Sequence, residues 1–244
     1  MHRTLIARLG LLIGLLTPLS AGATDVQGEL LADATWSPEG NPWTVTGDVV
    51  VPDGVVLTIE AGAQVVFDLD DLEDRGTART ELMVDVGGTL LVAGTAEERV
   101  AFTTLANNPS RGQWEGLTLQ DGAVADIDHA DISWAVNGLV LEGGAIADLE
   151  EVTVRQSSSV GVRAFDGAEL AVAGGSFSSN AAQGIRVGEG THSVRDAVIF
   201  GNDGIGLYVL MADPASTFLG DHISSVRNST GAWLSRGDHR TILS

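Results

Sequence analysis

Apolar and polar residues alternate through the second half of the chain, and the alternation restarts at a regular interval. Each restart follows a glycine, and these glycines lie 22 to 25 residues apart: Gly116, Gly138, Gly161, Gly184, Gly206 and Gly231. Apolar residues then take every second position, as in Leu117 and Leu119 or Leu139 and Leu141. A period of two is typical of β-strands. A repeat of this length is typical of one turn, or rung, of a solenoid.

Each repeat contains three such alternations, which predicts three short strands per rung. In the first repeat the second strand includes Ala125 and Ile127, and the third includes Ala130 and Ile132. Stacked rungs would place each strand parallel to its equivalent, about 4.8 Å away. We expect glycines at the corners because glycine reaches positive φ without steric cost. A β-sandwich with evenly spaced strands is the alternative, although sandwiches seldom repeat turn glycines in fixed register.

The start of the chain has the pattern of a secretory signal. Arg3 and Arg8 precede or flank an apolar stretch, and small residues follow at Ala21, Gly22 and Ala23. We therefore predict a signal peptide at residues 1–23, with an uncleaved anchor as the minor alternative. Because no later segment has 18 consecutive apolar residues, an integral membrane protein is not expected. The predicted location is secreted, periplasmic or on the cell surface.

Residues 34–103 carry a different set of phrases, which precedes the regular repeats. These phrases are Thr35-Trp36, NPW at 41–43, GDVVVPDGVVLTIEAGA at 47–63 and GTLLVAGT at 88–95. This order resembles the N-terminal part of secreted bacterial right-handed parallel β-helix repeat proteins, within the pectin-lyase-like superfamily. The resemblance implies an all-β, right-handed parallel β-helix with rungs of about 22–25 residues. It also implies that the lead-in caps the open edge of the first rung.

The predicted organisation is a signal peptide at 1–23, an N-terminal cap at 24–53 and a β-helix at 54–244 whose last rung is incomplete. An incomplete last rung leaves two alternatives, an oligomer or missing C-terminal rungs. The resemblance assigns no function, because the superfamily includes lyases, hydrolases, esterases, adhesins and proteins of no known activity.

The charge of the chain is strongly negative. All 13 basic residues are arginine, against 33 acidic residues, and the formal net charge is −20. Nucleic acid is a poor partner for such a surface. The absence of cysteine excludes disulfides and cysteine-based catalysis. An acidic exterior serves either solubility in a salty medium or cation binding, and we favour solubility.

An outward column two residues after each rung glycine contains the candidate binding residues. It consists of Thr118, Val140, Arg163, Arg186, Tyr208 and Trp233. Phe165 is predicted to lie on the same face as Arg163. Arginine and aromatic side chains one rung apart can bind an extended acidic or neutral glycan by ion pairing and ring stacking. The alternative is that Arg163, Phe165, Arg186, Tyr208 and Trp233 only stabilise an exposed sheet face.

Two acidic groups are candidates for calcium, the only cofactor that the sequence suggests. Asp68, Asp70 and Asp71 lie in a polar loop that lacks the spacing of an EF-hand. Asp126 is predicted to align with Asp148 on the next rung, next to Asp128 and Glu150. Like charges on adjacent strands repel, so either solvent screening or a cation must offset them. Screening is the favoured explanation at both places.

The catalytic signatures of the superfamily are missing from the sequence. The NTD, GHG and RIK phrases of polygalacturonases do not occur, and a lysine base is impossible without lysine. A calcium-dependent lyase site would combine acidic calcium ligands with an arginine base. Asp126, Asp148 and Arg155 are candidates for such a site by residue type alone. His192, His222 and His239 are predicted to lie at the surface near turns, without a metal-ligand spacing. Asn180 and Asn202, four residues before their rung glycines, suggest a short asparagine stack.

The leading hypothesis is an exported, non-catalytic β-helix that serves as a scaffold or binding protein. Its expected partner is a polysaccharide or a component of the cell envelope. The alternative is a polysaccharide lyase or glycoside hydrolase with an unrecognised site on the β-helix face.

Overall fold

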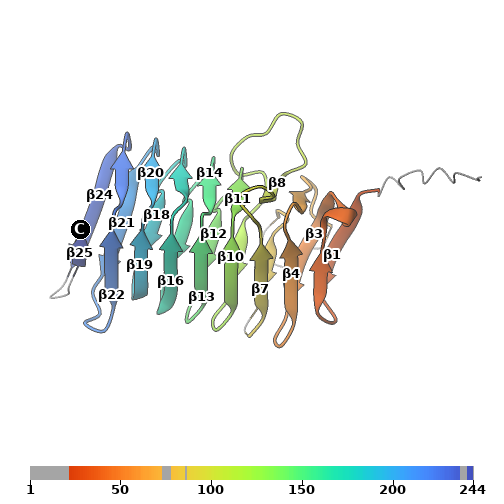
Figure 1. Cartoon of the computed structure of the whole chain (residues 1–244), viewed down its shortest axis with the longest axis horizontal. Helices are drawn as coiled ribbons and strands as arrows, with labels where there is room; N and C mark the ends of the chain where they lie inside the picture. Colours follow the sequence, from red (N-terminus) through yellow and green to blue (C-terminus); the bar gives the residue numbers. More distant parts are fainter. Residues whose placement is uncertain (1–21, 73–77, 86, 237–240, 244) are drawn as a thin grey trace, which may run out of the picture.

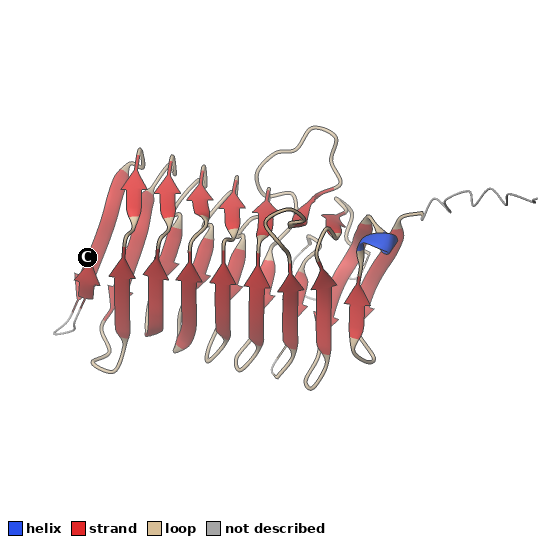
Figure 2. Cartoon of the chain, viewed as in Figure 1, coloured by secondary structure: helices blue, strands red, loops and turns tan. Residues whose placement is uncertain are grey.

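A computed structural model describes residues 22–72, 78–85, 87–236 and 241–243, and these residues coil into a parallel β-helix (Figure 1). Every strand pairing in it is parallel and joins one rung to the next, as the repeat predicts. Among the described residues, the one helical element is a short 3-10 helix, η1 (Pro38–Gly40) (Figure 2). Residues 1–21 of the predicted signal peptide lie outside the described residues.

Three flat faces run along the axis, and each receives one strand per rung. Face A is the nine-stranded sheet: β2 (Ala34–Trp36), β4 (Val56–Glu60), β7 (Thr89–Ala93), β10 (Val124–Asp128), β13 (Ile146–Glu150), β16 (Ala168–Ala173), β19 (Gly190–Arg195), β22 (Thr217–Asp221) and β25 (Thr241–Leu243). Face B follows in each rung: β5 (Gln64–Phe67), β8 (Val100–Thr104), β11 (Ala130–Ser133), β14 (Thr153–Arg155), β17 (Ser176–Ser178), β20 (Val198–Phe200) and β23 (Ser224–Val226).

Face C closes the rung before the chain returns to face A. Its strands are β6 (Leu82–Val84), β9 (Leu117–Leu119), β12 (Leu139–Leu141), β15 (Val162–Ala164), β18 (Ile185–Val187), β21 (Ile205–Met211) and β24 (Thr230–Arg236). The long strand β3 (Trp43–Val51) pairs with both β5 and β6, so it joins faces B and C. The lead-in already contributes strands to the stack, because β1 (Thr24–Glu29) pairs with β3 and β2 pairs with β4.

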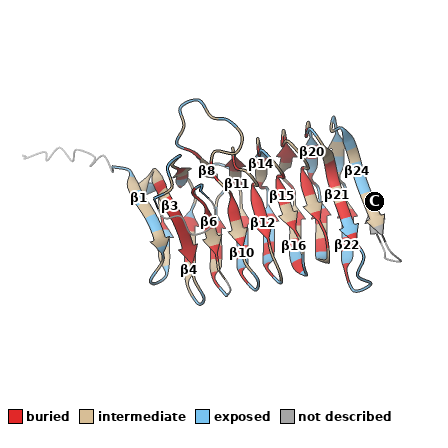
Figure 3. Cartoon of the chain, turned by 180° about the vertical axis from the view of Figure 1, so that it is seen from behind, coloured by how far each residue is buried: buried red, intermediate tan, exposed pale blue. Residues whose placement is uncertain are grey.

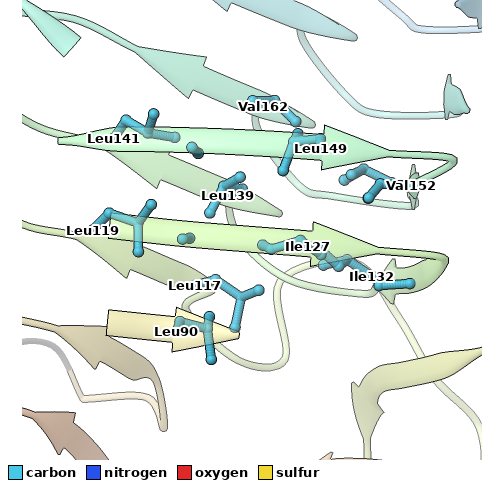
Figure 4. Close-up of a cluster of buried hydrophobic side chains, with 14 of the residues drawn as sticks. Leu90, Leu117, Leu119, Ile127, Ile132, Leu139, Leu141, Leu149, Val152 and Val162 are labelled. Atoms are coloured by element: carbon cyan, nitrogen blue, oxygen red, sulfur yellow. The ribbon is translucent and has the colours of Figure 1, made fainter. Parts of the chain in front are cut away.

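The core is a continuous column of inward side chains. Leu119 pairs with Leu141 on the next rung, and Ala164 and Val187 follow in the same register. Figure 4 shows Leu119 and Leu141 one above the other, as well as Leu117 and Leu139. Buried and exposed positions alternate along the strands (Figure 3). Burial of this apolar surface is the main favourable contribution to folding in a chain without disulfides.

The rung glycines are required for a reason other than the predicted positive φ. Of the six, Gly116 has a φ in the left-handed region and the other five do not. Gly138, Gly161, Gly184 and Gly206 instead lie against the next rung: a Cβ on Gly161 would lie 2.5 Å from the carbonyl oxygen of Gly184, and one on Gly206 would lie 2.6 Å from that of Gly231. The six regular glycines therefore mark a lack of space between rungs. The positive φ expected of corner glycines occurs at other positions, such as Gly122 and Gly143.

The left-handed corners are of two kinds. Between faces C and A the residues with positive φ are mostly glycines, as expected: Gly54, Gly87, Gly122, Gly143 and Gly167. At the corner between faces A and B, residues with positive φ include His129, Glu151, Asp196 and His222. At the corner between faces B and C they include Gln156 and Ser179. The left-handed conformation is uncommon for such residues, so the stacked rungs must stabilise it.

The suggested asparagine stack is present, and it has a third member. Asn180 and Asn202 are buried and join through a hydrogen bond of 3.0 Å from Asn180 Nδ2 to Asn202 Oδ1. Asn202 Nδ2 donates in turn to Asn228 Oδ1 at 2.8 Å. Each side-chain oxygen also accepts a backbone N–H from the preceding rung, for example that of Ser157 at Asn180. This asparagine ladder pairs backbone groups at the corner between faces B and C.

One long loop, residues 105–116, leaves the regular coil between β8 and β9 (Figure 1). Arg111 in this loop forms an ion pair of 2.6 Å with Asp203 and a hydrogen bond of 3.3 Å with Gln156. The loop therefore lies across the corner of several later rungs.

Candidate functional site

The candidate binding residues form one column on the outer surface of face C. The register pairs Arg163 with Arg186, Arg186 with Tyr208 and Tyr208 with Trp233, so the four lie on consecutive rungs. Thr118 and Val140 precede them in the same column. Strands β12, β15, β18, β21 and β24 succeed one another along this face, and all of them except β18 are labelled in Figure 3. With Phe165 just after β15, we call Arg163, Phe165, Arg186, Tyr208 and Trp233 the arginine–aromatic ladder.

Cation–π contacts hold the arginines of the ladder in place. The guanidinium carbons of Arg163 and Arg186 lie 5.4 and 4.9 Å from the centre of the Phe165 ring. The Arg186 guanidinium carbon also lies 5.4 Å from the centre of the Tyr208 ring. Phe165 packs on Gly188, where a Cβ would come within 2.8 Å of the ring atom Cε1. Two cations therefore share one aromatic ring whose position is fixed by a glycine.

Neither arginine of the ladder has a counter-ion. Among the described residues, no ion pair or side-chain hydrogen bond involves the guanidinium of Arg163 or Arg186, and Arg186 Nε is buried without a partner. Other arginines of the chain do find acceptors: Arg99 binds Asp131 at 3.0 Å, and Arg111 binds Asp203. In a chain with 33 acidic residues, two adjacent unpaired arginines leave positive charge available to an external anion.

Acidic side chains border the N-terminal side of the ladder. Glu142 follows β12, one rung before Phe165, and is half-buried. Further along, Glu81 is only 4% exposed and accepts a 3.5 Å hydrogen bond from the Thr118 hydroxyl. Burial, together with the charges of Asp48 and Glu115, raises the pKa of Glu81 to about 7. The positive potential of the ladder is thus confined to the rungs that begin at Arg163.

The acidic columns lie on face A, in the register that the sequence predicts. Asp126 pairs with Asp148, and Asp128 pairs with Glu150. The carboxylates line a hollow of about 200 Å³ whose floor includes Ala171 and Ala173. Partial burial and the neighbouring Asp126 and Glu150 raise the pKa of Asp128.

An arginine that the sequence reasoning missed lines the same hollow. Arg195 follows Glu150 and Ala173 in the register, two rungs from Glu150 and three rungs from Asp128. Arg155, which has the right residue type, lies instead on face B in β14. Arg195 could have been found by counting two repeats on from Glu150, but only after the exact strand register was known.

The structure offers no arrangement of ligands for the suggested calcium ions. Among the described residues, no group of three or more histidine, aspartate or glutamate side chains could hold a metal ion. In the polar loop, Asp70 is exposed and Asp68 accepts the backbone N–H of Leu69 at 2.7 Å. Calcium binding by Asp68, Asp70, Asp71, Asp126 or Asp148 stays a prediction.

The expectation of surface histidines is wrong for His192. This residue lies in β19 and is only 2% exposed, because its side chain points inward between Leu170 and Phe218 of the adjacent rungs. Nε2 lies 3.2 Å from the Gly188 carbonyl oxygen, and Nδ1 has no partner. Burial lowers the pKa of His192 from 6.5 to about 4. His222 is exposed beside Asp221, and His239 lies outside the described residues.

His192 is expected to weaken the fold in acid. The unfolded chain takes up this proton near pH 6.5 and the native state only near pH 4, so stability falls by about 3 kcal/mol as the pH drops between these values. Denaturant unfolding at pH 7 and pH 4 should show a smaller loss for His192→Phe than for the wild type. His222→Phe is the exposed control. An identical pH dependence in His192→Phe and the wild type would contradict the assignment.

One protein-family model and one solved structure match this chain. The family described as "Pectate-lyase like beta helix domain" matches residues 28–148. A crystal structure of the periplasmic alginate epimerase AlgG is similar over 86% of this chain and 73% of that chain, with 11% sequence identity and a TM-score of 0.37. Curated proteins give no significant sequence match. In the described part of the chain, we find no helix with the length and apolar character needed to span a membrane.

Proposed function

We propose that this protein, whose residues 28–148 match a pectate-lyase-like β-helix domain, is an exported, non-catalytic β-helix that binds an acidic polysaccharide on face C. The observation that carries the proposal is the pair of adjacent arginines without counter-ions, Arg163 and Arg186, held over the Phe165 ring. Carboxylates bind guanidinium groups through strong, often bidentate hydrogen bonds. The predicted signal peptide agrees with a polysaccharide outside the cell or in its envelope.

The geometry also suits a linear polymer. Successive ladder residues lie one rung apart, about 4.8 Å, which is comparable to the length of one sugar residue in an extended chain. A flat, regular face without a deep pocket allows such a chain to lie along the axis. Ring stacking on exposed aromatic residues then adds to the ion pairing.

Replacing both arginines should abolish retention on an acidic polysaccharide. In native affinity electrophoresis through a gel that contains a polyuronate, we expect the wild type to be retarded and Arg163→Gln/Arg186→Gln to migrate freely. The loss of two charge-assisted contacts predicts binding weaker by about 100-fold. Arg155→Gln, an exposed arginine on face B, is the matched control.

The net charge of the protein makes this test stringent. At −20 the chain is repelled by a polyanion unless a specific site attracts it. Equal migration of the wild type and the double variant in the polyuronate gel would contradict the proposal that face C binds an acidic polysaccharide.

A second candidate function rests on the hollow of face A. Clustered carboxylates beside Arg195 offer acid–base groups that a polysaccharide lyase or glycoside hydrolase would use. A screen for reducing ends and unsaturated products on acidic polysaccharides tests it. If the wild type turns over one of these polysaccharides and Asp148→Asn does not, the protein is an enzyme and the non-catalytic proposal is wrong.

A further inference from the structure

The arginine–aromatic ladder has two chemically different halves along the helix axis. Its N-terminal half consists of Arg163 and Arg186 with the Phe165 ring between them. Its C-terminal half consists of Tyr208 and Trp233, on the next two rungs. The outer surface beside Tyr208 continues with Leu210, so this half presents apolar surface without a charged side chain from the column.

The aromatic half is open to a ligand. Trp233 is 54% exposed, which is unusual for so large an apolar side chain, and Leu210 is 38% exposed. The Arg186 guanidinium already covers one side of the Tyr208 ring. A sugar that bound here would place its C–H groups against indole and leucine carbons. A carboxylate over Trp233 would lose water without gaining a cationic partner from the described side chains of this half, which is unfavourable.

The other end of the ladder is closed to an anionic chain. The column continues from Arg163 to Val140, which is only 7% exposed, and Glu142 lies on the rung before Phe165. The Glu142 carboxylate repels a polyanion, so the bound chain must run from Arg163 toward Trp233.

Given the proposed function, on which this inference rests, we infer that the ladder selects a mixed glycan in which acidic sugars are followed by uncharged ones. The acidic units lie over Arg163 and Arg186, and the uncharged units lie over Tyr208 and Trp233. From Arg163 to Trp233 the ladder spans three rung spacings, about 14 Å, so at least three sugar units are needed to cover it. A pure polyuronate makes favourable contacts only with the half of the ladder that contains Arg163 and Arg186.

The test compares three tetrasaccharides by calorimetry or fluorescence titration: one with two uronates followed by two neutral sugars, called the mixed ligand, one all uronate and one all neutral. We expect the mixed ligand to bind about tenfold more tightly than the all-uronate ligand, with negligible binding of the neutral one. Trp233→Ala should weaken the binding of the mixed ligand about tenfold and leave the all-uronate affinity within twofold. Phe200→Ala, which removes an aromatic ring that is 38% exposed on face B, is the matched control.

The outcomes separate the two proposals. If the all-uronate and mixed ligands bind equally and Trp233→Ala weakens the binding of neither, the two-part ladder is overturned while the polysaccharide site stands. If Arg163→Gln/Arg186→Gln leaves the binding of all ligands unchanged, or the wild type binds none of them, the proposed function fails and the inference fails with it.

Discussion

Asn202→Ala is expected to lower the free energy of unfolding by about 4 kcal/mol. The substitution removes the acceptor of the backbone N–H and of Nδ2 of Asn180, each bonded at 3.0 Å, and the donor to the Phe177 carbonyl oxygen at 3.1 Å. These groups are then buried without partners, at about 1–3 kcal/mol each. Urea unfolding followed by circular dichroism measures the loss.

The control for this variant is Asn107→Ala, an exposed asparagine in the loop between β8 and β9. It should change stability by less than about 0.5 kcal/mol, as is usual at exposed sites. A similar small effect for Asn202→Ala would mean that water replaces the ladder at this corner, contrary to the burial of Asn180 and Asn202.

The second large effect is expected from Gly184→Ala. A Cβ here would lie 2.5 Å from Ile199 Cγ2 and 2.9 Å from both Asn202 Nδ2 and the Gly206 carbonyl oxygen. To relieve these clashes, the next rung and the asparagine ladder must move away from residue 184. We therefore expect the free energy of unfolding to fall by about 3 kcal/mol or more. Thermal or urea unfolding of the purified variant gives the value.

Gly231→Ala is a matched control for Gly184→Ala because it occupies the same column. Its Cβ would meet nothing closer than 3.3 Å, at the Ser225 carbonyl oxygen. We expect it to be at least 2 kcal/mol less harmful than Gly184→Ala. Equal losses of stability in the two variants would show that backbone conformation, and not the close approach of adjacent rungs, requires glycine at these positions.

The fold and the register of the ladder could be predicted because both follow from a fixed period. Once each rung is known to have 22 to 25 residues, Arg163 must lie beside Arg186, and Tyr208 beside Trp233. The same counting placed Asp126 beside Asp148. In a solenoid each residue contacts mainly its own rung and the next, so a one-dimensional pattern contains most of the three-dimensional contacts.

The features that could not be predicted depend on what fills the space around a residue. Histidine is usually a surface residue, so the sequence predicts that His192 is exposed. It belongs to the core because it lies between Leu170 and Phe218 of the adjacent rungs. The rung glycines have the sequence appearance of turn residues, but their role depends on the distance to the next carbonyl oxygen. The missing counter-ions of Arg163 and Arg186 depend on where every nearby carboxylate lies, which a repeat pattern does not give.

The ion pair between Arg111 and Asp203 joins residues 92 positions apart in the sequence. A stack of rungs in which each contacts only its neighbours can fray one turn at a time from either end. A loop that spans several rungs opposes this, because the turns beneath it cannot separate until its own contacts break. The middle of the β-helix therefore melts as a larger cooperative block than its repeat length implies, and this block includes the rungs that carry Arg163 and Arg186.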